Sequence, residues 1–271
     1  MALSPGFAGH AGLTLTEGPA GSIVRREGAA IWMARADEAW SADVTHVHLW
    51  LHAAQAAAHE FHSGGVGGFD DVVAKIDRAR ALGIAVAVSS LLTRSSARVL
   101  AELPGWLHAR DVRAWRVAVP RVVGRVHPGT LGVAGVGALD GLVPRLGAAL
   151  PYALQALAIA GRLGITAGIG GAPLCLLGPF AATAVPEDSR AYAGVCEGCP
   201  ARPRCPGVDG GYLRRFGGDE LSPQALRTGA GAGPPAWLFP GPGMLSQVET
   251  DMSVETARKV RLPVVSGGPD G

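Results

Sequence analysis

Three of the chain's four cysteines stand close together, at Cys196, Cys199 and Cys205, in a C-x2-C-x5-C pattern. The fourth, Cys175, lies upstream in the segment Gly-Ala-Pro-Leu-Cys-Leu-Leu-Gly. Thiolates are the ligands that zinc and iron–sulfur clusters prefer, and four of them complete the coordination of either. The sequence therefore predicts one metal or cluster centre that uses every cysteine of the chain.

The residues around these cysteines suit a bound cluster. Proline stiffens a loop, which lowers the entropy lost when the loop becomes ordered. Glycine lets the backbone pass close to a bulky group, so that N–H groups can reach sulfur. The region contains Pro200, Pro203, Pro206, Gly194, Gly198 and Gly207.

Two other uses of four cysteines have to be weighed. Two disulfides suit a small secreted chain, whereas this one has 271 residues and shows no signal peptide. Zinc is the stronger alternative, because C-x2-C is also half of a zinc site. The C-x5-C arm is longer than a usual second zinc arm, and only one C-x2-C is present. Spacing alone leaves both a cluster and zinc open.

The composition is that of a chain with a large buried core. Hydrophobic residues make up 48% and charged residues 17%, and the net charge is only +2. Such a small charge gives no support for binding to nucleic acids or membranes. Glycine, proline or arginine interrupts each apolar run before it reaches the ~20 residues that span a bilayer. We therefore expect a cytoplasmic protein with reduced cysteines, folded as one large domain or two small ones.

Strand and helix patterns alternate along most of the chain, which predicts βα units and a parallel sheet. Four or five strands are too few for a complete eight-stranded barrel, so we expect an α/β fold with a partial barrel or an open sheet. The loops are predicted at His59–Gly68 and Arg121–Gly137. The expected strands are Ala20–Val24, Val44–Leu51, Ile84–Leu92, Val112–Pro120 and Ile165–Ile169. The expected helices are Glu27–Trp40, Phe69–Leu82, Ser96–Leu107 and Leu139–Leu163, the last divided by Pro144 and Pro151.

These patterns divide the chain into four parts. Residues 1–19 are a loose lead-in, 20–172 a partial βα barrel, 173–228 the cysteine region and 229–271 a flexible tail that loses the periodicity. The strand Ala20–Val24 would leave an open sheet edge, and open edges attract partners. Trp50 and Trp115 are expected on the inner face of the barrel, where an apolar surface also favours a protein partner or a second copy.

Several segments together resemble the second half of the core barrel of radical S-adenosylmethionine enzymes, and the cysteine region resembles the auxiliary-cluster tail of their SPASM and twitch subfamilies. The barrel segments are Trp50-Leu51-His52-Ala53, His59-Glu60, Gly67-Gly68-Phe69, Gly83-Ile84-Ala85-Val86 and Leu91-Leu92-Thr93-Arg94. The tail segments are Pro173-Leu174-Cys175, the run from Cys196 to Gly207, Tyr212 and Phe216-Gly217.

The chain also departs from that family at the positions that matter for catalysis. The family's C-x3-C-x2-C motif and its Gly-Gly-Glu-Pro segment are absent. Trp50 and Ala53 replace the Ser and Gly of a strand end that lines the cofactor pocket in the family. Asp209 stands where a further cysteine would follow Cys205, so only one auxiliary cluster is expected. These departures argue against bound S-adenosylmethionine.

The resemblance therefore implies a barrel of the radical S-adenosylmethionine type that is incomplete at its N-terminus and carries a cysteine-rich, cluster-binding C-terminal extension. It implies one auxiliary 4Fe–4S cluster on Cys175, Cys196, Cys199 and Cys205. The function implied is that of a partner or substrate-binding subunit in peptide or natural-product maturation, acting on a peptide substrate and not catalytic by itself. The alternatives are a radical enzyme whose catalytic cluster comes from another chain, and a zinc-stabilised binding module.

Histidines and arginines give weaker signals. His46, His48 and His52 share one face of a predicted strand because their positions have the same parity. A polar strand face at the mouth of the barrel explains them better than a metal site, as it does His59 and His62. If the face is functional, the resemblance points to His52 and His59. The arginines are interpreted as solvated surface residues; they are Arg25, Arg26, Arg121, Arg125, Arg214 and Arg215.

Overall fold

A computed structural model describes residues 13–17, 23–27, 30–34, 44–63, 68–120, 143–185 and 191–223. Its strands are β1 (Leu13–Glu17), β2 (Ile23–Glu27), β3 (Ala30–Ala34), β4 (His46–Trp50), β5 (Ala85–Leu91), β6 (Ala114–Ala118), β7 (Thr166–Gly170) and β8 (Ala184–Val185). Its α-helices are α1 (Ala56–Ser63), α2 (Gly68–Ala81), α3 (Leu103–Ala109), α5 (Leu146–Arg162), α6 (Leu174–Leu177) and α7 (Gly210–Phe216). Its 3-10 helices are η3 (Ala97–Glu102), η4 (Gly178–Thr183), η5 (Gly194–Cys196) and η6 (Arg202–Arg204).

The described strands form a single sheet in which spatial order follows chain order, from β1 to β8. The first three strands pair antiparallel, and every neighbouring pair from β3 to β8 is parallel. Parallel neighbours need a crossover connection, and helices supply it between β4 and β7. The predicted α/β class with parallel βα units is therefore confirmed.

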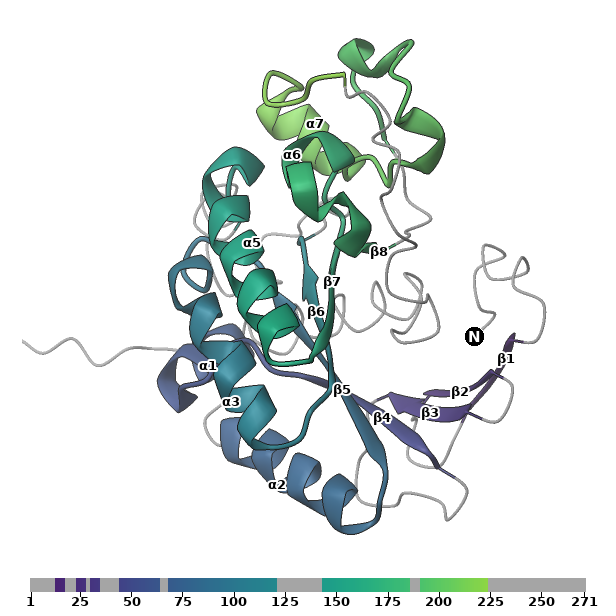
Figure 1. Ribbon diagram of the computed structural model, residues 1–271, viewed down its shortest axis with the longest axis vertical. Helices are drawn as coiled ribbons and strands as arrows, with labels where there is room; N and C mark the ends of the chain where they lie inside the picture. The colour runs from purple at the N-terminus through teal and green to yellow at the C-terminus, as the bar shows by residue number, and fades with distance from the viewer. Residues whose placement is uncertain are drawn as a thin grey trace, which may run out of the picture.

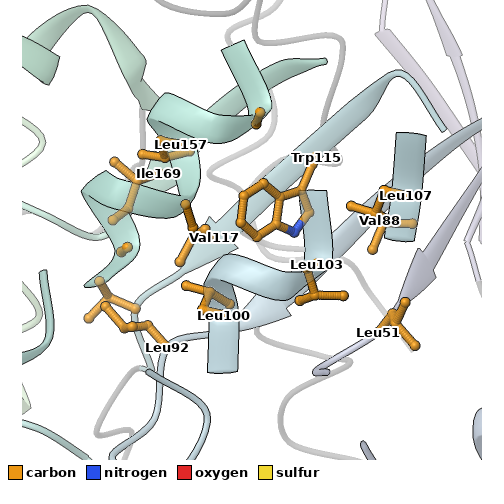
Figure 2. Packing of buried hydrophobic residues seen from close by; sticks show 14 of the residues in the cluster. Leu51, Val88, Leu92, Leu100, Leu103, Leu107, Trp115, Val117, Leu157 and Ile169 are labelled. Atoms are coloured by element: carbon orange, nitrogen blue, oxygen red, sulfur yellow. The ribbon is translucent and has the colours of Figure 1, made fainter. Parts of the chain in front are cut away.

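The helices α1, α2, α3 and α5 lie on one side of the parallel strands (Figure 1). Between these helices and the sheet lies the main core, centred on Trp115 of β6, which is fully buried. Figure 2 shows its indole among leucines of η3 and α3 and aliphatic residues of the strands. Burial of this apolar surface drives the packing of the two layers.

Helix α2 illustrates how local sequence and packing agree. Asp70 and Asp71 lie in its first turn, and Arg78 and Arg80 lie in its last. These charges interact favourably with the helix dipole and stabilise the helix. Its buried residues Val72, Ile76 and Ala79 recur at helical spacing. Gly83 follows the helix with a φ of 69°, a conformation that glycine adopts without strain.

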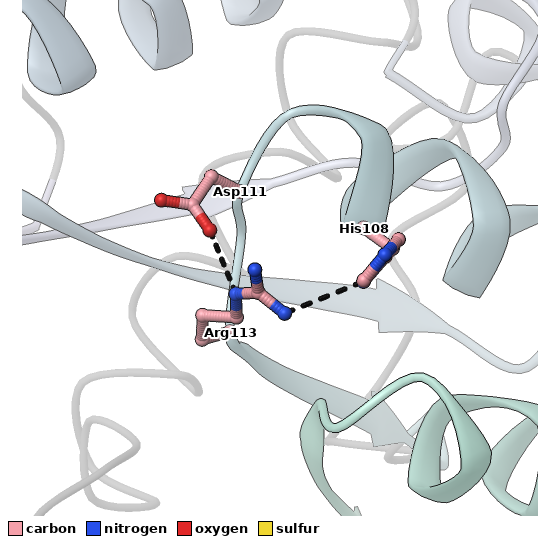
Figure 3. A network of polar contacts seen from close by, with 3 residues as sticks. All are labelled: His108, Asp111 and Arg113. Carbon is pink, nitrogen blue, oxygen red and sulfur yellow. Dashed lines mark hydrogen bonds and ion pairs between the residues drawn. The ribbon is translucent and has the colours of Figure 1, made fainter.

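A polar network on the surface shapes the turn between α3 and β6 (Figure 3). Asp111 occupies this turn with a φ of 58°. Arg113 donates from Nε to its carboxylate at 2.7 Å and from Nη1 to Nδ1 of His108 at 3.3 Å. These side chains are exposed, so the network contributes little stability and serves to fix the local turn.

Helix α5 corrects the prediction that Pro151 divides the segment Leu139–Leu163. The structure has one helix that begins at Leu146, after Pro144, and continues through Pro151. Proline removes one backbone hydrogen bond inside a helix. The buried alanines and leucines that follow it pack on η3 and α3, and this packing outweighs the local loss. Residues 139–142 lie outside the described residues.

The predicted helix Glu27–Trp40 is wrong. Residue 27 ends β2, and Ala30–Ala34 form β3, which pairs with β2 on one side and β4 on the other. The run Ala-Ile-Trp-Met-Ala is a short continuous apolar stretch, and such a stretch does not distinguish a buried strand from a buried helix. Pairing with two neighbours decided in favour of the strand.

The N-terminal edge was also predicted wrongly. Leu13–Glu17, within the expected lead-in, forms β1 and pairs with β2. Val24, expected at an open edge, lies between Thr16 and Met33 in the sheet. The sequence of the lead-in has few large apolar residues, but backbone pairing does not require them. β1 therefore covers β2 and is itself the edge strand of the described sheet.

Other boundaries differ in smaller ways. Helix α1 occupies part of the predicted loop His59–Gly68. The predicted helix Ser96–Leu107 consists of η3 followed by α3. The expected count of four or five strands omitted β1, β3 and β8.

The predicted loop Arg121–Gly137 and the tail 229–271 lie outside the described residues. No helix in the described ranges is long and apolar enough to cross a bilayer.

Candidate metal centre

Two segments of the chain bring the cysteines together. Cys175 lies in α6, which begins a few residues after β7 ends. Cys196 ends η5, Cys199 lies in the following turn, and Cys205 comes directly after η6. All four are free thiols and line the same pocket. The structure thus gathers the residues that the spacing pattern singled out.

Two glycines let this loop bend tightly around the pocket. Gly198 and Gly207 have φ values of 72° and 67°, in the left-handed region that favours glycine. At Gly207 a Cβ atom would lie 2.7 Å from the carbonyl oxygen of Ala191, so there is no room for a side chain. An antiparallel bridge between Ala191 and Val208 closes the base of the loop.

Backbone N–H groups point at the sulfur atoms, as a thiolate-bound centre requires. Leu174 and Gly207 donate to Sγ of Cys205 at 3.4 and 3.3 Å. Burial raises the pKa of the Cys175 thiol, and a backbone hydrogen bond from Ser222 opposes that shift. Nearby Cys205 and Cys196 raise this pKa further, because thiolates repel one another. Cys175 is therefore protonated until a cation or cluster displaces the proton.

The four thiols are suitable donors for a metal or a cluster, but their side chains are not already arranged as a coordination sphere. Within the described residues, no three His, Cys, Asp or Glu side chains form a group that could hold a metal ion. Binding would therefore have to draw the cysteines of this pocket closer together.

Asp209, at the position where the resemblance would place a further cysteine, has a structural role. Its carboxylate accepts a hydrogen bond from the backbone of Tyr212 at 3.0 Å and so caps α7. Arg214 and Arg215 lie on this helix, and the guanidinium of Arg215 lies 5.6 Å from the Phe216 ring. Arg25 and Arg26 lie on β2, while Arg121 and Arg125 lie outside the described residues.

The histidines of β4 lie on one polar face of the sheet. His46 and His48 share the face of β4 that is directed away from the helix-covered core, as their parity predicted. Nδ1 of His46 is 2.8 Å from the hydroxyl of Thr45, and Nε2 of His48 is 2.8 Å from the hydroxyl of Ser89. His52 and His59 are brought together as a stacked pair, with ring centroids 5.4 Å apart. The side chain of His62 lies outside the described residues.

Trp50 and Trp115 do not share a face, which corrects the prediction that both line the inner side of the barrel. Trp50 pairs with Ser89, and Ser89 pairs with Arg116, so these three form one row across the sheet. Trp115 precedes Arg116 and therefore points the opposite way, into the helical core. Its indole N–H donates to the hydroxyl of Ser90 at 2.9 Å.

Sequence reasoning missed Arg116, although an arginine inside the apolar strand Val112–Pro120 was a visible signal. Its side chain is 1% exposed, and its guanidinium lies 6.0 Å from the Trp50 ring. Sequence reasoning also missed Tyr192 and Arg202, which line the cysteine pocket. Nothing in their spacing separated them from surface residues.

Compared with protein-family models and with curated proteins, the chain matches none. The function therefore has to be argued from the cysteine pocket and the polar face of the sheet.

Proposed function

We propose that this chain is an iron–sulfur protein in which Cys175, Cys196, Cys199 and Cys205 hold one 4Fe–4S cluster. The observation that carries the proposal is that all four cysteines, the only ones in the chain, line a single pocket. N–H donors directed at Cys205 support it, because hydrogen bonds to sulfur stabilise bound clusters. When bound, the cluster would supply one-electron redox chemistry or a rigid structural centre.

The spacing of the cysteines favours a cluster over zinc. Zinc sites commonly use short Cys arms, whereas here only one C-x2-C is present and the second arm, C-x5-C, is longer. Leu174, Val208 and Leu221 line the same pocket and would keep water from the cluster.

We further propose that the fold is a partial barrel of the radical S-adenosylmethionine type and that the chain is a partner or substrate-binding subunit in peptide or natural-product maturation. The parallel strands with helices on one face support this proposal. So does the row of Trp50, Ser89 and Arg116 on the other face, where a buried cation lies near an aromatic ring. The indole N–H of Trp50 is buried and has no hydrogen-bond partner among the described residues, so a peptide carbonyl could accept from it.

Metal analysis of anaerobically purified protein tests the first proposal. We expect a brown protein with about four iron and four sulfide per chain. Replacing Cys199 with Ser should lower both contents strongly, whereas Ser222→Ala, at the wall of the same pocket, should keep them because it retains the backbone hydrogen bond from residue 222 to Cys175. One zinc per chain and no sulfide would contradict the proposal and favour a zinc-stabilised binding module.

A further inference from the structure

A single cation is fixed against the cysteine pocket. Arg202 and Tyr192 both line this pocket. The guanidinium of Arg202 lies over the Tyr192 ring, with Cζ 4.8 Å from the ring centroid. The Tyr192 hydroxyl donates to the carbonyl oxygen of Cys205 at 2.9 Å. The arginine side chain is therefore positioned by a ring that is itself bound to one of the cysteines.

The backbone of Arg202 is tied to the cysteines as well. Its N–H donates to the carbonyl of Cys199 at 3.0 Å, and its carbonyl accepts from the N–H of Cys205 at 3.2 Å. The turn that carries the charge is thus the turn that spaces Cys199 from Cys205. An exposed arginine usually moves freely, but the stacking and these two hydrogen bonds restrict this one.

We propose that Arg202, held in place by Tyr192, raises the reduction potential of the bound cluster. This inference rests on the proposed iron–sulfur function. A cluster with four thiolates is anionic, and reduction by one electron from an external donor adds a further negative charge. A fixed cation beside it stabilises the reduced state more than the oxidised state. The apolar walls of the pocket strengthen the effect because they lower the local dielectric constant.

Arg204 offers a matched comparison. It belongs to the same 3-10 turn and is also exposed, but it does not line the pocket. Arg204→Gln therefore removes the same charge from nearly the same place without removing the contact. Arg202→Lys keeps a charge while losing the planar group that stacks on Tyr192.

The test is an anaerobic redox titration of the full chain with dithionite, following cluster absorbance. We expect Arg202→Gln to weaken the preference for the reduced state about tenfold, a negative shift of about 59 mV for a one-electron couple. Arg202→Lys should recover part of this shift, and Arg204→Gln should change the potential much less. Iron and sulfide contents should equal those of the wild type in all three variants.

Two results would distinguish a failure of this inference from a failure of the cluster assignment. A loaded wild type whose potential is unchanged in Arg202→Gln, or shifts equally in Arg204→Gln, would overturn this inference and leave the cluster assignment intact. A wild type that contains no iron would overturn the cluster assignment and this inference together.

Discussion

At the residue scale, the stacked histidines His52 and His59 are held in defined protonation states by the backbone. Nδ1 of His59 accepts the N–H of His52 at 3.1 Å, and Nδ1 of His52 accepts the N–H of Leu91 at 3.3 Å. A nitrogen that accepts carries no proton, so both rings are neutral and carry their proton on Nε2. Protonating either Nδ1 would break a buried hydrogen bond at the carboxyl end of β4.

This arrangement predicts acid sensitivity of the fold. Burial lowers the pKa of His59 from its ordinary value of 6.5, and the nearby Glu60 carboxylate only partly opposes this. Burial also lowers the pKa of His46. Because the folded pKa lies below the unfolded one, the unfolded chain binds more protons at acid pH. The contribution of His59 to the free energy of unfolding should therefore have its full value above pH 6.5. It should fall as the pH drops through the folded pKa of His59.

Denaturant unfolding between pH 8 and 5 would measure this dependence. His59→Asn keeps an acceptor for the N–H of His52 without a titrating group, so the variant should lose less stability on acidification than the wild type. His108→Asn, which replaces an exposed histidine on α3, is the comparison variant. Identical pH profiles for the wild type and His59→Asn would contradict the assignment to His59.

At the element scale, a link between α5 and the cysteine region positions the candidate metal centre. The Tyr212 hydroxyl accepts the N–H of Leu146 at 2.9 Å and donates to the Glu220 carboxylate. The other oxygen of Glu220 accepts the N–H of Gly147 at 3.2 Å. Together they satisfy free N–H groups at the start of α5, where Arg145 provides no side-chain cap.

The same link reaches the sulfur ligands. Leu221, which follows Glu220, is buried against the core, and the next residue, Ser222, directs its N–H at Cys175. Burial and the hydrogen bond to Glu220 raise the pKa of Tyr212 well above its usual range, so the phenol stays neutral. The Tyr212 hydroxyl therefore keeps the proton that it donates to Glu220.

Removing the Tyr212 hydroxyl should loosen this link. Tyr212→Phe keeps the ring, which lies 4.8 Å from that of Phe216, but leaves the N–H of Leu146 unsatisfied. We expect a loss of about 1–3 kcal/mol in the free energy of unfolding and faster hydrogen exchange at Leu146. Asp219→Ala, an exposed neighbour of the link, is the control. Equal exchange rates in the two variants would show that the hydroxyl does not hold the helix start.

At the scale of the whole molecule, the edge of the sheet and the cysteine pocket bear differently on the question of a partner. The strand expected at the N-terminal edge, β2, is paired on both sides, and β1 is the edge strand of the described sheet. Under the proposed function, the case for a partner rests on the cysteines: all four line one pocket, so none remains for a separate catalytic cluster. Cleavage of S-adenosylmethionine in the radical family needs a cluster iron with an open coordination site.

Because no cysteine remains for a catalytic cluster, we expect that the chain does not cleave S-adenosylmethionine by itself. Loaded protein incubated with S-adenosylmethionine and dithionite should release no more 5′-deoxyadenosine than protein from which the cluster has been removed. Chromatography of the quenched reaction measures the product. Release above that control, and its loss in Cys199→Ser, would mean that the single cluster is catalytic and that the subunit role is wrong.

The sequence by itself determined the elements whose periodicity is strong, and it singled out the four cysteines that line one pocket. The strands β4, β5, β6 and β7 and helix α2 lie where the patterns placed them, because alternation and helical spacing report directly on burial. The cysteines were identified from their spacing, because the number of residues between two cysteines limits whether both can reach one centre.

Only the tertiary structure decided the questions that depend on distant neighbours. Ala30–Ala34 is a strand because β2 and β4 pair with it, and no local signal distinguishes that from a helix. Trp50 and Trp115 face opposite sides because strand register, not residue type, sets the direction of a side chain. The contact of Tyr212 with Leu146 joins residues that are 66 positions apart in the chain. Sequence spacing carries no information on such contacts, because they form only when separately folded elements pack together.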